Sequence, residues 1–262
     1  MDELLTVSGL NVRAMTSEGA IPLLKDINLS LHKGEVLGMI GESGSGKTTA
    51  VRSIIGLLDR NVSVDSGEIK FRGTLLKSPK VENYRAVRGK HIGMVFQGVG
   101  QSLDPMMRVG AQIEEVARRH GPGLSRGDAR ALALETIGAM GFPNPIVMAK
   151  SYPHELSGGM RQRVSIALAM VTHPELLIAD ECTSALDVTT QRSVIQLLAS
   201  LVDSNDMGML FVTHDLMLAE EICTSIAVLQ SGRVVEYGKT EQVLGSPREE
   251  YTQALLRAIP SW

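Results

Sequence analysis

A glycine-rich segment between a short apolar strand and a helix restricts the fold of this chain most. Residues 35–40 are predicted to form a buried strand, and residues 48–58 carry apolar side chains at helical spacing. The segment between them has the P-loop pattern, in which a glycine at each end of a turn is followed by lysine and threonine. It consists of Gly41, Glu42, Ser43, Gly44, Ser45, Gly46, Lys47 and Thr48. A strand, a glycine turn and a helix in this order begin an α/β unit.

The residue types of the P-loop suit the binding of a polyphosphate. Glycines let successive backbone N–H groups turn inward, and the following helix adds the positive end of its dipole. Lys47 can reach the outer phosphates and the Thr48 hydroxyl can ligate Mg²⁺, while Thr49 completes the predicted nucleotide-binding set. A flexible Gly/Ser turn before a helix is the alternative interpretation. The flanking strand and helix favour nucleotide binding, but they leave open what the nucleotide drives.

The composition of the chain is that of an ordinary globular protein, and it argues against several classes of protein. Of the 262 residues, 44% are hydrophobic and 21% are charged, which leaves little room for extended disorder. The formal net charge of −3 argues against nucleic-acid binding through a large basic surface. The apolar runs are too short to cross a bilayer, and the acidic N-terminus does not resemble a signal peptide. Cys182 and Cys223 match no metal or redox spacing, so we expect a protein of the cytoplasm.

The middle of the chain differs in character from the segments before it. Residues 4–31 mix short β-like runs with turns and are predicted to form antiparallel strands. Residues 111–120 and 128–140 are alanine-rich and amphipathic, with glycine and proline breaks at 121–123 and 141–143. This pattern predicts an inserted helical subdomain.

Alternation of strands and helices resumes after the insertion. Residues 176–179 and 209–212 have the pattern of fully buried strands, and residues 191–203 that of the helix between them. Continuous apolar strands of this kind suit a parallel sheet that is covered on both faces.

Five further segments occur in the order typical of ABC transporter ATPases, which the chain resembles from about residue 4 to residue 260. Taken singly, each segment is weak evidence of function, since Gln97 could be a solvated loop amide and His214 a structural histidine. Their joint order behind a P-loop favours function. The segments are 95–97 (Q-loop), 156–163 (the signature motif, usually written LSGGQ), 176–181 (Walker B), 184–187 (D-loop) and 212–215 (switch histidine).

The resemblance implies hydrolysis of ATP to ADP and phosphate, with a role for each matching residue. Thr48 and Asp180 would hold or orient Mg²⁺, for which hydroxyl and carboxylate oxygens are suitable ligands. Glu181 would polarise the attacking water as general base, and Gln97 would sense both the metal and the water. His214 would contact the γ-phosphate. The protein would supply position and charge rather than covalent chemistry.

The signature residues imply that two subunits clamp ATP face to face. Ser157 and Gly159, at the start of a helix, would cap the γ-phosphate of a nucleotide bound to the opposite subunit. The expected fold class is an α/β P-loop NTPase with a RecA-like parallel sheet core, an N-terminal antiparallel β part and an inserted α-helical subdomain. We expect a single domain over residues 1–262, with the core in 1–97 and 164–262 and the helical subdomain in 98–163.

A narrower resemblance is to the ATPases of peptide and nickel importers. It rests on P-loop residues 41–47, on residues 102–105 with 108–110, on Met160 in the signature and on the tail 251–256. Peptide is the expected cargo, and nickel or another metal chelate is the alternative. The branch implies as partners a second ATP-binding subunit, two transmembrane permease subunits and, indirectly, an extracytoplasmic solute-binding protein. The second ATPase is expected to be a different chain, with an identical copy as the alternative, on the cytoplasmic face of the membrane.

Three features depart from the family pattern. Many members place an aromatic residue on the adenine near the position of Ala14, whereas residues 4–31 contain no aromatic, and Arg13 is the available substitute. Cys182 follows Glu181 where proline is usual, and it is either a small buried hydrophobe or a thiol that reagents can reach. The chain ends at Trp262, whereas many relatives carry a further C-terminal segment.

Two other classes of function remain to be weighed. Soluble ABC ATPases of DNA repair carry a long coiled-coil insertion, and those of translation carry two cassettes; this chain has neither pattern. A module that binds ATP without hydrolysing it is disfavoured because Glu181 and His214 are both present.

Overall fold

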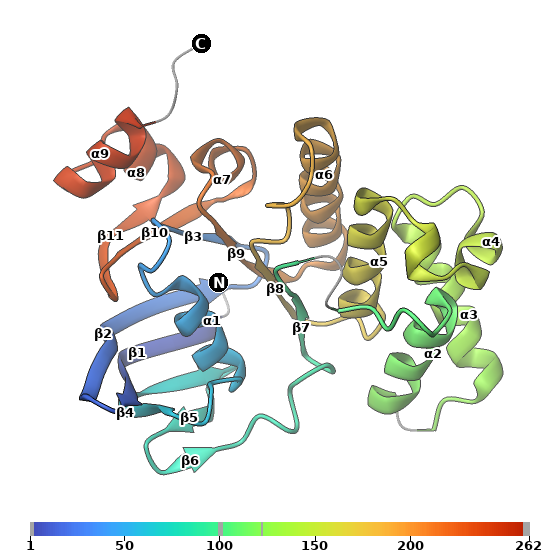
Figure 1. Cartoon of the computed structure of the whole chain (residues 1–262), viewed down its shortest axis with the longest axis horizontal. Coiled ribbons are helices and arrows are strands. Elements are labelled where there is room, and N and C mark those ends of the chain that lie inside the picture. The colour runs from blue at the N-terminus through green and yellow to red at the C-terminus, as the bar shows by residue number, and fades with distance from the viewer. Residues whose placement is uncertain (1–2, 99–101, 122, 259–262) are drawn as a thin grey trace. The chain divides into compact units, whose positions relative to one another are not determined.

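The computed structural model describes residues 3–98, 102–121 and 123–258 (Figure 1). The predicted break at 121–123 and the loop after Gln97 therefore lie partly outside the described residues, and the chain end at Trp262 lies wholly outside them. The chain divides into two compact units, Met1–Ala86 with Asp206–Trp262, and Val87–Asn205. The second unit also contains strands and the helix that follows them, so this division differs from the predicted boundaries at 98 and 163. Those boundaries stay a prediction.

The first unit contains an antiparallel sheet in the order β2-β1-β4-β5-β6. Along β1 the buried and exposed side chains largely alternate, as expected for a strand with one face on a core, and Val7 pairs with Leu29 and with Ile69. The antiparallel strands predicted over residues 4–31 are confirmed. The strands are β1 (Glu3–Thr16), β2 (Gly19–His32), β4 (Val62–Phe71), β5 (Thr74–Ser78) and β6 (Val81–Glu82).

The same unit contains a second set of strands in the order β11-β10-β3-β9. Strands β10, β3 and β9 run parallel, and every residue of β3 and β9 is buried, because helix and sheet cover both faces. Helix α7 packs on β3 and β9, while β2 contacts β9 and β11. These strands are β3 (Val36–Ile40), β9 (Gly208–Thr213), β10 (Ser225–Gln230) and β11 (Arg233–Lys239).

Four helices belong to the described part of the first unit. Helix α1 follows β3 directly and ends at Gly56, which adopts the left-handed conformation common after a helix. Asp215 caps α7 by accepting bonds from the amides of Met217 and Leu218. The helices are α1 (Lys47–Ile55), α7 (Leu216–Ile222), α8 (Thr240–Gly245) and α9 (Glu250–Arg257).

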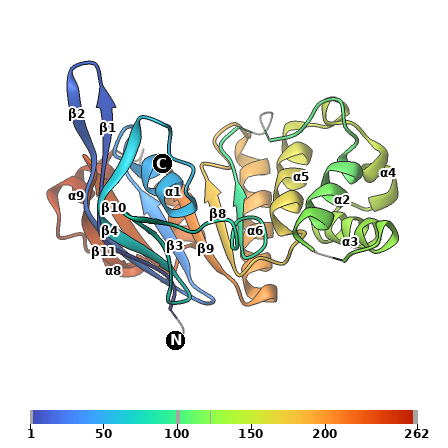
Figure 2. The ribbon, with the colours of Figure 1, turned by 90° about the horizontal axis from the view of Figure 1, so that it is seen from below.

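The second unit combines a pair of parallel strands, β7 (Ile92–Val95) and β8 (Leu176–Asp180), with a group of helices. Helices α2, α3 and α4 contact one another, and α2 and α3 also contact α5 (Figure 2). The predicted helices at 111–120 and 128–140 are confirmed. The elements are α2 (Val109–His120), α3 (Arg126–Ala139), α4 (Pro145–Lys150), the short 3₁₀ helix η1 (Pro153–Glu155), α5 (Gly158–Met170) and α6 (Val188–Asn205).

Helix α4 was missed by the sequence reasoning, although a local signal for it exists. Asn144 accepts a bond from the amide of Val147, and Pro145 occupies the first turn, where its missing N–H costs nothing. Across the described residues, no helix has both the length and the apolar character that a bilayer crossing requires.

Candidate nucleotide-binding and catalytic site

The P-loop lies between β3 and α1 in the first unit, and its backbone requires glycine. Gly41 has a φ of 150°, and a side chain there would collide with the carbonyl of Leu229. Gly44 has a φ of 82°, and a Cβ atom at this position would meet no atom within 4 Å. The first glycine therefore lets the loop pass close to β10, and the second faces open space.

Two polar side chains are buried in this loop. Lys47, only 4% exposed, donates from Nζ to the carbonyl oxygens of Gly41 at 2.7 Å and Glu42 at 3.0 Å. Ser45 is 5% exposed, and its Oγ has no hydrogen-bond partner among the described residues. A buried hydroxyl without a partner is costly in a finished core. Its position beside a buried ammonium and a helix N-terminus fits a site for a polyphosphate.

The switch histidine lies at the same edge of the parallel strands as the P-loop. Strands β3 and β9 are parallel neighbours, with Ile40 paired to Thr213. Gly41 and His214 each follow directly after this pair. His214 is exposed, and the Thr213 hydroxyl accepts a bond from the amide of Asp215, which begins α7. Ligands of open α/β sheets bind at the carboxyl ends of the strands, which is where both residues lie.

In the second unit the structure brings Gln97 and Glu181 together. Strands β7 and β8 pair Val95 with Ala179, and two residues further on Gln97 Nε2 donates to Glu181 Oε2 at 2.7 Å. Asp180 closes β8 and is 4% exposed. Glu181 has a φ of 43°, a left-handed conformation that is uncommon for a residue with a side chain. Such strain is held by the surrounding structure and gathers at functional sites.

The signature residues lie at the start of α5, as predicted. The hydroxyl of Ser157 accepts a bond from the amide of Met160 and so caps the helix. A Cβ atom at Gly159 would lie 2.5 Å from a methyl group of Thr190, so this glycine allows α5 to approach α6 closely. The exposed Ser157 and the first amides of α5 present hydrogen-bond donors to an anion.

The D-loop aspartate also begins a helix. Asp187 accepts bonds from the side-chain hydroxyl of Thr190 at 2.7 Å and from its amide at 3.0 Å. These bonds lower the pKa of Asp187, so the carboxylate stays ionised at the start of α6.

The predicted metal ligands belong to both units. In the first unit, Thr48 lies in the first turn of α1. In the second unit, Gln97 follows β7 and Asp180 is the last residue of β8. Within the described ranges, no three side chains of histidine, cysteine, aspartate or glutamate form a metal-binding group. Hydroxyl, amide and single carboxylate donors suit Mg²⁺, which is usually bound by few protein ligands together with substrate phosphates.

The structure changes the interpretation of three residues outside this set. Ala14 is 9% exposed on the buried face of β1, so its side chain is not available as a surface for a base. The guanidinium of Arg13 pairs with the carboxylate of Asp65 at 2.9 Å. Cys182 is 3% exposed, and burial raises the pKa of its thiol to about 12, with Asp180 adding to the shift. The prediction of a small buried hydrophobe fits this position.

One contact of the loop was not foreseen. The hydroxyl of Tyr251, on α9, accepts a bond from the amide of Glu42 at 3.1 Å. Tyr251 belongs to the tail that resembles the importer branch, but the sequence contains no signal that brings this tail to the P-loop.

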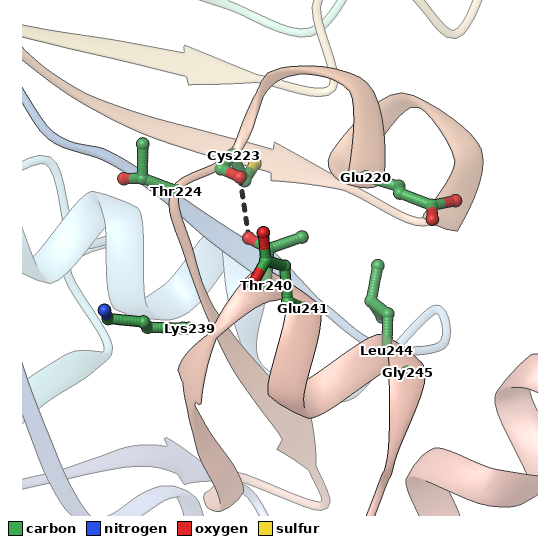
Figure 3. Close-up of a pocket in the computed structure, with 8 residues that line it drawn as sticks. All are labelled: Glu220, Cys223, Thr224, Lys239, Thr240, Glu241, Leu244 and Gly245. Atoms are coloured by element: carbon green, nitrogen blue, oxygen red, sulfur yellow. Dashed lines mark hydrogen bonds between the residues drawn. The ribbon is translucent and has the colours of Figure 1, made fainter.

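A pocket of about 590 Å³ lies elsewhere in the first unit, between α7, the end of β11 and α8 (Figure 3). Among the residues that line it, the Thr240 hydroxyl donates to the carbonyl of Cys223 at 2.6 Å. Burial raises the pKa of the Cys223 thiol to about 12. None of the predicted site residues lines this pocket. The residues that line it are Glu220, Cys223, Thr224, Lys239, Thr240, Glu241, Leu244 and Gly245.

A P-loop with its buried lysine, a carboxylate pair at the end of a parallel strand and a capped signature helix define a P-loop ATPase. The chain belongs to the ABC transporter family, whose model matches residues 24–184. It is an ABC-type ATPase, and the predicted α/β fold class is confirmed.

Relatives and solved structures support this assignment over nearly the whole chain. The chain is 39% identical to the dipeptide transport ATP-binding protein DppD of Lactococcus lactis, over 99% of this chain and 74% of that protein. It is 40% identical to the oligopeptide transport ATP-binding protein OppD of Bacillus subtilis, over 98% of this chain and 72% of that protein. The ATP-binding cassette MJ0796, solved as a post-hydrolysis dimer bound to ADP and Pi, is 30% identical. It matches with a TM-score of 0.78 over 90% of this chain and 99% of that one.

Proposed function

We propose that this chain hydrolyses MgATP to energise the import of peptides. The observation that carries the proposal is the bond between Gln97 and Glu181, because it joins a general base to the residue expected to sense metal and water. Both residues follow parallel strands at their carboxyl ends, next to the buried carboxylate of Asp180.

Binding of the phosphates is assigned to the P-loop. Lys47 and the loop amides hold the β- and γ-phosphates, and the partnerless hydroxyl of Ser45 supports this role. Thr48, Asp180 and Gln97 would hold Mg²⁺, which neutralises charge on the phosphates when it is bound. His214 lies at the end of β9, from where it contacts the γ-phosphate.

Hydrolysis is assigned to Glu181, which takes a proton from the attacking water. Gln97 orients the carboxylate of Glu181 by its hydrogen bond to Oε2. Ser157 and Gly159 act on the nucleotide of a second cassette. The capped start of α5 supports this role, since the first amides of a helix attract anions.

Peptide is favoured as cargo by the relatives. The proteins of L. lactis and B. subtilis named above are dipeptide and oligopeptide transport ATP-binding proteins. The dipeptide protein of Escherichia coli is 40% identical over 99% of this chain. Their names favour peptide over nickel or another metal chelate.

The partners are those that the resemblance to peptide importers implies. A second ATP-binding subunit of different sequence, two permease subunits and an extracytoplasmic binding protein would complete the importer, with this chain on the cytoplasmic face of the membrane. The dimer of the solved cassette supports the pairing of two ATPases.

The experiment is transport by the chain together with its co-purified membrane partners. Reconstituted into liposomes with a saturating binding protein, the complex should take up labelled dipeptide or oligopeptide in an ATP-dependent manner. Glu181→Gln should abolish uptake while the complex still assembles. Uptake of nickel and not of peptide would overturn the cargo, and ATP-independent uptake would overturn the function.

A further inference from the structure

We propose that Tyr251 is a positioning residue for ATP binding, which orients the P-loop peptide group that holds Lys47. The inference rests on the proposed role of Lys47 in binding phosphate. Its basis is the bond from the amide of Glu42 to the hydroxyl of Tyr251, 209 residues away in the sequence.

The bond acts on one peptide group from its N–H side. The carbonyl of Gly41 and the amide of Glu42 belong to the same trans peptide group. Its carbonyl accepts from Lys47 Nζ at 2.7 Å, and its N–H donates to Tyr251 at 3.1 Å. In a planar trans peptide these two groups point in opposite directions. Two partners on opposite sides therefore fix the rotation of the peptide plane.

This peptide group lies where the exposed part of the loop begins. Glu42, Ser43 and Gly44 are exposed, whereas Gly41 and Ser45 on either side are buried. Backbone bonds from Ser45 to Glu42 and from Gly232 to Ser45 hold the later part of the loop. Tyr251 supplies a partner from outside the loop at its first turn.

Helix α9 is itself anchored, so the tyrosine hydroxyl has a defined position. The carboxylate of Glu236 on β11 accepts bonds from the amides of Arg248 at 2.9 Å and Glu249 at 3.3 Å, directly before α9. Burial alone would raise the pKa of Glu236, but these bonds, together with the Thr252 side chain and the charge of Arg248, outweigh it and lower the pKa. Thr252, next to the tyrosine, is 1% exposed.

These contacts form a continuous support for the loop. Strand β11 pairs with β10, and β10 pairs with β3, the strand that leads into the P-loop. Helix α9, which carries Tyr251, and the P-loop, which contains Glu42, are thus supported by the same group of strands. The Tyr251 hydroxyl, supported in this way, orients the Gly41 carbonyl that binds Lys47, and this role requires no contact with the nucleotide.

The test is the affinity of the full-length chain for the fluorescent analogue mant-ATP in the presence of Mg²⁺, with KM and kcat measured in the assembled complex. Tyr251→Phe removes one hydroxyl and keeps the ring. Because a hydrogen bond contributes a modest net amount to an equilibrium, we expect affinity to fall by about two- to tenfold. KM should rise by the same factor while kcat changes little, since Glu181 is untouched.

Tyr237→Phe is the matched control. Its hydroxyl donates to the carbonyl of Ser30 at 3.1 Å in the same unit, and this bond does not involve the P-loop. It should leave mant-ATP affinity unchanged, even if both variants melt at slightly lower temperature. A fall in affinity for Tyr251→Ala that Tyr251→Phe does not share would show that only the ring matters and would overturn the proposal.

Lys47→Ala separates this inference from the proposed site. If Lys47→Ala binds mant-ATP normally, the assignment of the phosphate site is wrong. If Lys47→Ala loses binding and Tyr251→Phe keeps wild-type affinity, the phosphate site stands and the positioning role of Tyr251 is wrong.

Discussion

Gln97 and Glu181 share a hydrogen bond of 2.7 Å although 84 residues separate them. The parallel pairing of β7 and β8 brings them together, and the left-handed backbone of Glu181 directs its side chain at the end of β8. A carboxylate held in this way would lose little freedom in the proposed role of general base, which is how position contributes to phosphoryl transfer.

Replacing Glu181, the proposed general base, should separate ATP binding from hydrolysis. Glu181→Gln keeps the shape of the side chain, but an amide cannot take a proton from water. We expect hydrolysis to slow by roughly 10²–10⁴ while mant-ATP affinity stays unchanged. The variant should accumulate as an ATP-bound pair with its partner subunit. Near-wild-type turnover in the assembled complex would show that another group is the base.

The hydrogen bond from Gln97 should contribute less to ATPase activity than the carboxylate of Glu181, the proposed base. Gln97→Ala removes the orienting amide and leaves the carboxylate in place. Steady-state ATPase activity should fall, but by less than in Glu181→Gln, and the two effects should not add in the double variant, because both act on one group. Additive losses would mean that Gln97 acts independently of Glu181.

A tyrosine at position 14 should destabilise the chain without improving the binding of adenine. Ala14 is 9% exposed, and a large side chain in a packed site costs roughly 1–3 kcal/mol. Thermal unfolding of Ala14→Tyr should begin at lower temperature than that of Met15→Tyr, whose parent side chain is 53% exposed. Gain of ATP affinity in Ala14→Tyr with an unchanged melting temperature would contradict this expectation.

Wild-type discrimination between ATP and GTP should be modest. Arg13 pairs with Asp65 through Nε, and this ion pair competes with the use of its guanidinium for stacking. Affinity should then depend mainly on the phosphates, without the roughly 1–3 kcal/mol that stacking a base on an aromatic adds. Competition of ATP and GTP for mant-ATP binding measures the difference directly. A strong preference for ATP would indicate a base-binding surface outside the hairpin of β1 and β2.

The family resemblance implies that the segment between Gln97 and Arg108 meets the permease subunits, so substitutions there should uncouple transport from hydrolysis. The Arg108 guanidinium lies 5.6 Å above the ring of Tyr152, which precedes the signature, and Asp104 accepts a bond from the amide of Met106. Arg108→Ala, or Asp104→Asn, which keeps an acceptor oxygen, should reduce peptide uptake while basal ATPase activity survives. Arg130→Ala, at an exposed position of α3, is the control. Unchanged uptake in both variants would place the contact with the permease elsewhere.

Several features of this protein were determined by local sequence. The strand before Gly41, the glycine turn and the helix after Lys47 lie within about twenty residues, so periodicity and residue type were sufficient to predict them. The same holds for the helix at 128–140 and for the start of a helix near Ser157, because both depend on neighbouring residues alone.

Only the tertiary structure decided which distant residues meet and which side chains are covered. The pairing of distant strands brings Gln97 within hydrogen-bond distance of Glu181, and the position of α9 brings the Tyr251 hydroxyl to the amide of Glu42. The buried state of Ala14 and Cys182 depends on which face of a strand or turn points to the core, and one residue of register reverses it. Contacts of this kind depend on chain segments separated by 80 or more residues, and no local pattern encodes them.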